Sequence, residues 1–251
     1  MDGFFELALE SAEIAGRGAE VKEKAVSRRV KRLSFTSNLP FGEGDFLRTQ
    51  GVYHTLVVQE DVLADLPLQR EISRGIAEVL SLCKVKKAKK VLVVGLGNPA
   101  TVVDALGCES VKRMTAGERG NRYLATLVPS VFGRTGVESL SVVKGVASEI
   151  HPDLVLCVDT LATRRAERLS RAVQITDGGI LPGGGVGNKR EVLCFESVGV
   201  PVLSVGVPLL SHADKCASLP QGLVVTPKEI DLLVPIFAGV IAEGVERALS
   251  Q

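Results

Sequence analysis

The sequence lacks the residue patterns of a metal site and of a disulfide framework. Its three histidines, His54, His151 and His212, are far apart, and none has the HxxxH or HxH spacing of paired metal ligands. The five cysteines are scattered without any CxxC spacing, and their number is odd. Because no signal peptide is evident either, we expect reduced thiols and a cytoplasmic location. We also expect no metal and no other cofactor.

Long apolar runs and an excess of one charge are absent as well. No run of about 18 uninterrupted apolar residues occurs, which argues against a membrane-spanning helix. The best candidate, residues 232–242, is short and lies between Asp231 and Glu243. The formal net charge is +1, so no overall field attracts the chain to nucleic acid or to an anionic membrane. We therefore expect neither as a direct partner.

The sequence does contain enough apolar material for a large core, since 45% of its 251 residues are hydrophobic and 24% are charged. From Val91 onward, strands that are apolar on both faces alternate with helical segments, including a basic helix between Asp159 and Ala172. Such strands are typical of a largely parallel sheet that is covered on both sides. We predict an α/β fold of the phosphorylase/hydrolase-like kind, a three-layer α/β/α sandwich around a largely parallel sheet.

We expect one domain over residues 1–251. It would consist of a mostly irregular N-terminal part (1–80), a sheet core (88–210) and a C-terminal helix (223–251). Within the N-terminal part, the patterns predict a strand at 53–59 and a helix at 66–82.

Two segments of the core each combine a buried strand, glycines and one acid. In KKVLVVGLGNPATVVDALG, an apolar strand is followed by a GLGN turn and then by Asp104. The second segment has Asp159 at the end of the strand DLVLCVD and continues through a basic stretch to a loop with six glycines at 178–190. A glycine costs extra backbone entropy unless the chain needs a positive φ or a close approach, so this loop indicates a site.

Each segment delivers one carboxylate near the carboxyl end of a strand, where open α/β sheets keep their ligand sites. Asp104 and Asp159 are therefore candidates for a general acid and a general base. The alternative is that each is a helix cap or a loop carboxylate, because Asp often begins helices for structural reasons. The residues alone leave both interpretations open.

A nucleotide site is a further alternative. The spacing Gly95-x-Gly97-x-x-Ala100 fits a loose dinucleotide fingerprint, with Glu118 near the position of a ribose-binding acid. However, Pro99 puts a residue without an N–H in the turn that would face the pyrophosphate. An acid near a helix start would also compete with the phosphate charge. A nucleotide- or nucleoside-binding α/β enzyme remains an alternative.

A colinear series of motifs runs through the chain: GLGN…DALG, LVPSVFGRTGVES, PDLVLCVDTLATR, QITDGGILPGGGVGNKR and GVPVLSVGVP. This series resembles the germination protease family of spore-forming bacteria. The likeness extends to residues 7–10 near the N-terminus and to the stretches 53–57 and 223–234. The sequence departs from the family at Cys108, where proline is usual, and in the short segment 211–220.

The resemblance implies an endopeptidase of an atypical aspartic type that degrades small acid-soluble spore proteins during germination. The family's two acids correspond to Asp104 and Asp159, without a metal. The resemblance also implies a homo-oligomer, tetrameric in the family, a location in the forespore or spore core, and a precursor that is processed between Glu6 and Leu7. The family fold is similar to that of hydrogenase maturation proteases. A peptidase of that type or a catalytically silent paralogue therefore remains an alternative.

Six further residues are candidates for binding the substrate around these acids: Asn98, Gly184, Asn188, Arg164, Lys189 and Arg190. The first three are expected to stabilise the oxyanion through amides or side chains. The three basic residues are expected to hold acidic side chains of the substrate, with salt bridges inside the protein as the alternative.

Overall fold

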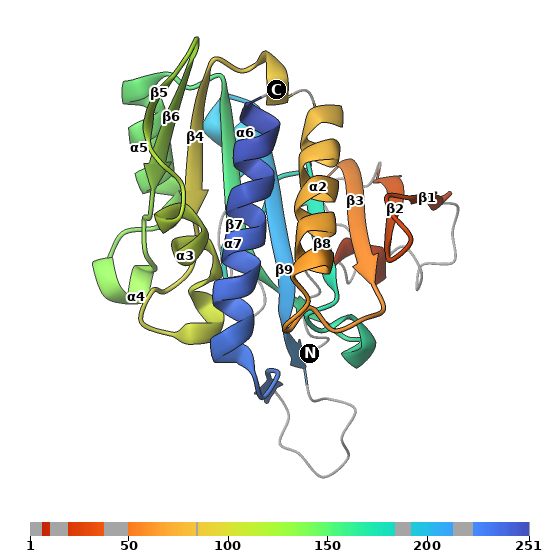
Figure 1. Cartoon of the computed structure of the whole chain (residues 1–251). Coiled ribbons are helices and arrows are strands. Elements are labelled where there is room, and N and C mark those ends of the chain that lie inside the picture. Colours follow the sequence, from red (N-terminus) through yellow and green to blue (C-terminus); the bar gives the residue numbers. More distant parts are fainter. Residues whose placement is uncertain are drawn as a thin grey trace.

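The computed structural model describes residues 7–10, 20–37, 50–83, 85–183, 192–212 and 223–250. The strands among them form one ten-stranded sheet in the order β1-β2-β3-β8-β9-β7-β4-β6-β5, with β10 paired to β9 (Figure 1). The strands are β1 (Lys22–Ala25), β2 (Val30–Ser37), β3 (Gly51–Val58), β4 (Lys90–Gly95), β5 (Gly117–Arg119), β6 (Arg122–Leu127), β7 (Leu154–Thr163), β8 (Ala172–Thr176), β9 (Val202–His212) and β10 (Val224–Val225).

The helices connect these strands. They are α2 (Leu66–Leu82), α3 (Leu106–Lys112), α4 (Phe132–Thr135), α5 (Ser139–Ile150), α6 (Phe195–Val198) and α7 (Ile230–Leu249), with the short 3-10 turns η1 (Val85–Lys87), η2 (Val102–Asp104) and η3 (Ala166–Arg168). In the part of the chain that the structure describes, no helix combines the length and the hydrophobicity needed to cross a bilayer.

The centre of the sheet is parallel. Strands β9, β7, β4 and β6 run in the same direction, and β7 is buried along its whole length. A strand that is buried on both faces shows no polar alternation, which explains why continuous apolar runs mark these strands in the sequence. The predicted α/β class with a largely parallel central sheet is confirmed.

The strands outside this centre are antiparallel to their neighbours. β8 pairs in this way with β3 and β9, and β5 with β6. The basic helix predicted between Asp159 and Ala172 is wrong, because the link from β7 to β8 contains only the single turn η3. A parallel return requires a crossover of about a dozen residues or more. The short link therefore brings β8 back in the opposite direction.

Helices cover both faces of the sheet, as the sandwich prediction requires. α2 and α7 lie in front of the sheet in Figure 1, and they share the larger hydrophobic core with Val91 and Val93 of β4. On the other face, residues of α5 pack against Leu92 and Val94, the alternate residues of the same strand. Because side chains alternate along a strand, β4 contributes to one core on each side.

The N-terminal part is more regular than expected. Strands β1, β2 and β3 form an antiparallel margin of the sheet, and β3 and α2 lie where the sequence predicted a strand and a helix. The sequence of β1 is KEKA and the strand is exposed, so no apolar alternation marks it. α2 begins after Asp65, whose carboxylate accepts the N–H of Leu68 at 2.9 Å as an N-cap.

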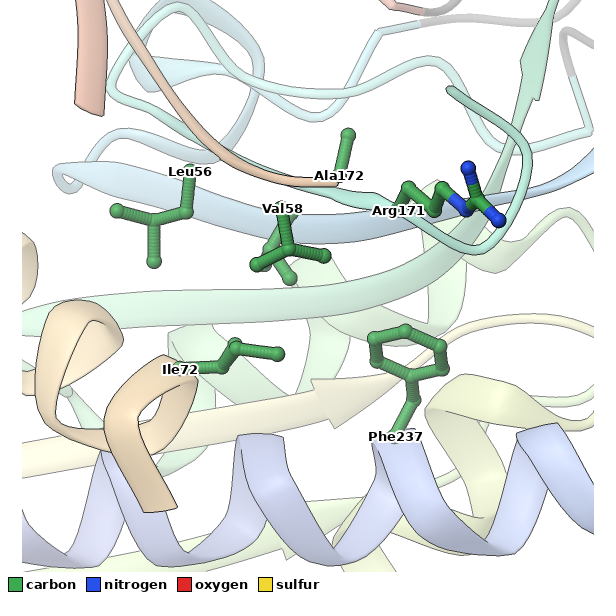
Figure 2. Close-up of a pocket in the computed structure, with 7 residues that line it drawn as sticks. Leu56, Val58, Ile72, Arg171, Ala172 and Phe237 are labelled. Carbon is green, nitrogen blue, oxygen red and sulfur yellow. The ribbon is translucent and has the colours of Figure 1, made fainter. Parts of the chain in front are cut away.

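Side chains fill the space between the sheet and helices α2 and α7. Figure 2 shows Leu56, Val58, Ile72 and Phe237 converging there, with Arg171 at the margin. Their contacts enclose no volume that a water molecule could occupy. This region is therefore packed core. In open α/β sheets, ligand sites lie instead at the carboxyl ends of the parallel strands.

Candidate active site

Asp159 lies where strand β7 continues beyond its neighbour. β4 ends at Gly95, which pairs with Val158, so Asp159 is the first residue of β7 past this ladder. The prediction that Asp159 ends its strand is wrong, because β9 continues to pair with β7 as far as Thr163. Asp159 is 4% exposed, and its Oδ1 accepts the N–H of Thr160 at 2.8 Å.

Asp104 ends the turn η2 in the loop that leaves β4. The N–H of Asn98 donates to Asp104 Oδ2 at 2.8 Å and to the Asp104 carbonyl oxygen at 3.1 Å. Gly97 has a φ of +100°, and a Cβ at this position would lie 2.0 Å from the Asp104 carbonyl oxygen. The loop therefore wraps closely around Asp104, and only glycine fits at position 97.

Neither acid caps a helix. α3 begins after Ala105 and has no side-chain cap, and Asp159 lies inside a strand. The alternative interpretation of the two acids as helix caps is thus wrong. The N–H of Asn98, in the turn expected to face a pyrophosphate, is bonded to the Asp104 carboxylate instead. A phosphate would be repelled at this position, so the loop does not favour a nucleotide.

Two contacts join the segments that carry the acids. The Thr160 hydroxyl, next to Asp159, donates to the carbonyl oxygen of Val103, next to Asp104, at 2.7 Å. A Cβ at Gly107 would lie 2.2 Å from the Val158 carbonyl oxygen, so α3 is pressed directly onto β7. We refer to Asp104, Asp159 and these bridging contacts as the acid site.

The thiol of Cys108 lies beside both acids. Cys108 is fully buried, and its Sγ is 3.7 Å from the Gly97 carbonyl oxygen. Burial, together with the negative charges of Asp104 and Asp159, raises the pKa of this thiol to about 11. At neutral pH, Cys108 is a protonated thiol and a poor nucleophile.

The residues predicted to bind substrate fall into two groups. Asn98 and Arg164 are described: Asn98 organises the loop around Asp104, and Arg164 directly follows β7. Gly184, Asn188, Lys189 and Arg190 lie outside the described residues, as does Glu6 of the predicted processing site. Leu7 is fully buried, and its N–H donates to the carbonyl oxygen of Ala162 at 3.3 Å.

Two residues were not marked by the sequence patterns, one beside the Asp104 loop and one at the end of β7. Arg134 of α4 donates from Nη1 to Asn98 Oδ1 at 3.4 Å, which places a cation beside the Asp104 loop. Glu10 is buried and bonded to the end of β7. Arg134 lies in the motif after β6, where a search for cations at strand ends would have found it. No local signal marks Glu10, because its partners lie more than 150 positions away.

Acidic, histidine and cysteine side chains do not cluster as a metal centre would require. Over the ranges that the structure describes, no three of them come together in a group that could hold an ion. The groups described at the acid site are two carboxyl groups, a backbone amide and nearby hydroxyl and guanidinium groups.

Comparison with known proteins identifies the family. A family model described as germination protease matches residues 10–219, a range that includes both acids. The chain belongs to the germination protease family. The family resemblance noted in the sequence is thereby confirmed, and the protein is a peptidase of spore germination.

Two germination proteases that align over most of their length are 31–34% identical to this chain. The germination protease of Caldanaerobacter subterraneus subsp. tengcongensis is 34% identical, over 83% of this chain and 81% of that protein. The germination protease of Clostridium tetani is 31% identical, over 97% of this chain and 94% of that protein. A solved NiFe hydrogenase maturation protease from Thermococcus kodakarensis KOD1 superimposes with a TM-score of 0.41 and 20% identity, covering 68% of this chain and 99% of that one.

Proposed function

We propose that this germination protease is an endopeptidase that uses Asp104 and Asp159 as an acid and base pair, without a metal, to hydrolyse small acid-soluble spore proteins. The observation that supports the pair is the hydrogen bond from Thr160 to Val103, which joins the immediate neighbours of the two acids. The shared effect of both carboxylates on the Cys108 thiol supports the same arrangement.

The chemistry follows from two carboxyl groups in one neighbourhood. Like charges that lie close together disfavour double ionisation, so one group keeps a proton while the other is a base. The base takes a proton from water, the water oxygen attacks the scissile carbonyl carbon, and the acid donates its proton to the leaving amine.

The surrounding residues have supporting roles in this proposal. The Asn98 side chain, rather than its N–H that donates to Asp104, stabilises the oxyanion together with Gly184 and Asn188, a contribution of about 3 kcal/mol per donor. Arg164, Lys189 and Arg190 hold the acidic side chains that flank the scissile bond. The enzyme works as a homo-oligomer in the cytoplasm of the forespore or spore core, after its precursor is cleaved between Glu6 and Leu7.

Activity on a small acid-soluble spore protein tests the pair. We expect Asp104→Asn and Asp159→Asn each to lower kcat by a hundredfold to about ten-thousandfold, because each removes a proton-transfer group. Asn retains an oxygen that can accept the hydrogen bonds seen at either position. Addition of EDTA should leave the unchanged protein active.

Asp231→Asn is the matched control, because Asp231 is an exposed aspartate in the first turn of α7. It should retain full activity. Full activity of either acid-site variant would contradict the pair, and inhibition by EDTA would contradict the metal-free reaction.

Intact-mass analysis of the incubated protein tests the processing step, since cleavage at any bond other than that between Glu6 and Leu7 would contradict it.

A further inference from the structure

Glu10 is a buried carboxylate outside the acid site. Its exposed fraction is 1%, and three donors from one short segment bind it. The Thr163 hydroxyl donates to Oε1, the N–H of Arg164 donates to Oε2 at 2.7 Å, and the N–H of Arg165 donates to Oε1 at 3.3 Å. Burying a carboxylate is costly without such partners. The three donors therefore compensate the buried negative charge of Glu10, and we refer to them as the Glu10 receptor.

A guanidinium completes the receptor. Arg168 of η3 places Nη1 3.7 Å from Glu10 Oε1, and its side chain is 12% exposed. Removing one partner of a buried charged pair leaves the other charge uncompensated, so such pairs hold their elements in place. Glu10 consequently ties the N-terminal segment to both the end of β7 and the turn that follows it.

The same segment is tied to the row of residues that contains Asp159. The N–H of Ala8 donates to Gln174 Oε1 at 2.8 Å. Gln174 of β8 and Asp159 of β7 both pair with Gly206 of β9, so the three residues form one row across the sheet. Residues 7–10 thus bridge from this row to Thr163, the last residue of β7.

The end of β7 needs this support because its sheet pairing is one-sided. Of the strands that the structure describes, only β9 continues the ladder with β7 beyond Val158, where β4 stops at Gly95. The Leu7 N–H and the Glu10 carboxylate contact β7 in this unsupported part, at Ala162 and Thr163. Asp159 lies between the end of the β4 ladder and these contacts.

We propose that Glu10 is a positioning residue of the acid site, which fixes the end of β7 and thereby the carboxylate of Asp159. The inference rests on the proposed function, in that Asp159 takes part in catalysis. A displacement of about 1 Å in a catalytic group can lower a rate by up to about a hundredfold. Loss of the receptor contacts should therefore lower kcat, with a smaller rise in KM because Glu10 also binds the N–H of Arg164, a proposed substrate-binding residue.

Glu10→Gln in the full-length protein tests the proposal. It keeps the side chain's shape but removes the charge and puts an NH2 group where an oxygen accepts a backbone N–H. We expect kcat to fall by about tenfold to a hundredfold, and KM to rise by a smaller factor. Hydrogen exchange at the amides of Arg164 and Arg165 should accelerate by a similar factor. Glu10→Asp, which keeps the charge, should recover part of kcat.

Glu167→Gln is the matched control, because Glu167 is an exposed residue of η3 next to Arg168. It should leave kcat, KM and amide exchange unchanged. If Glu10→Gln fails to fold, Arg168→Lys replaces it, since a retained charge with altered geometry should still lower kcat.

Two results would overturn the proposal. One is an unchanged kcat in a variant whose Arg164 and Arg165 amides exchange faster, and the other is a raised KM at constant kcat. Asp159→Asn, assayed in parallel, separates the two levels of inference. If Asp159→Asn is inactive while Glu10→Gln is fully active, the positioning role fails and the proposed function stands. If Asp159→Asn is fully active, the proposed function fails and the positioning role fails with it.

Discussion

The two acids sit in regions that are built in opposite ways. The surroundings of Asp104 come mainly from a short stretch of chain, since Gly97, Asn98 and Cys108 all lie within seven positions of it. The contacts around Asp159 come from distant segments, since Gly206 of β9 pairs with it across the sheet and Gln174 of β8 lies in the same row. The Asp104 half of the acid site is therefore formed by local sequence, and the Asp159 half by tertiary contacts.

This difference separates two sources of precision. A local loop is fixed by backbone conformations that particular residues permit, so it is sensitive to single substitutions within it. A strand end that is held by remote segments depends on the folding of the whole sheet and can be loosened from a distance.

Gly97→Ala should break the local half with the largest effect. The φ of +100° is unfavourable for alanine, and the added Cβ would lie 2.0 Å from the Asp104 carbonyl oxygen. We expect a loss of about 3 kcal/mol in the free energy of unfolding, measured by urea denaturation, and at least a hundredfold loss of kcat.

Gly145→Ala is its control. Gly145 lies in α5, and a Cβ there meets no atom within 4 Å. Because alanine is favoured over glycine inside helices, the control should be stabilised by up to about 1 kcal/mol. If the two variants had equal stability, the tight loop around Asp104 would be contradicted.

The same division explains what the sequence could predict. Asp104, its glycines and the apolar strands β4 and β7 are recognisable because their signals are local, and the motif order identified the family. Asp159 was found as an acid after an apolar run, but its place inside β7 depends on where β4 stops and β9 continues. Strand pairing of this kind is tertiary, so periodicity does not reveal it.

The N-terminal part and the link after β7 follow the same rule. Glu10 looks like an ordinary acid in LALE, and only the folded chain places it against Thr163, 153 positions away. The basic residues after Asp159 suggested a helix, yet two of their backbone N–H groups bind Glu10 and the chain makes only the turn η3. A buried carboxylate that uses backbone donors thus overrides the helical preference of this segment.

Thr160→Val should remove the hydrogen bond between the two halves of the acid site, with a smaller effect than Gly97→Ala. Valine has nearly the same shape but cannot donate to the Val103 carbonyl oxygen, which Thr160 contacts at 2.7 Å. The bond is partly buried, so its loss should cost about 1 kcal/mol of stability. We expect that loss in thermal or urea unfolding, with roughly a tenfold fall in kcat from misplacement of the acids. Thr160→Ser keeps the hydroxyl and should recover most of kcat. Equal activity of the valine and serine variants would show that the bridge does not position the acids.

The smallest expected effect is on the pKa of the Cys108 thiol, which depends on the charges of both acids although the thiol takes no part in the reaction. Burial is the largest cause of its raised pKa of about 11, and the charges of Asp104 and Asp159 add to it. Negative charge disfavours the thiolate, so Asp104→Asn and Asp159→Asn should each lower the pKa of Cys108, while burial keeps it above the usual value.

The pH dependence of iodoacetamide labelling, followed by peptide mass mapping, distinguishes Cys108 from the other cysteines. In either variant, labelling of Cys108 should begin at lower pH than in the unchanged protein, and Asp231→Asn should have no effect. A shift in only one of the two variants would mean that the other carboxylate lies too far from the sulfur, and would separate the two halves of the acid site.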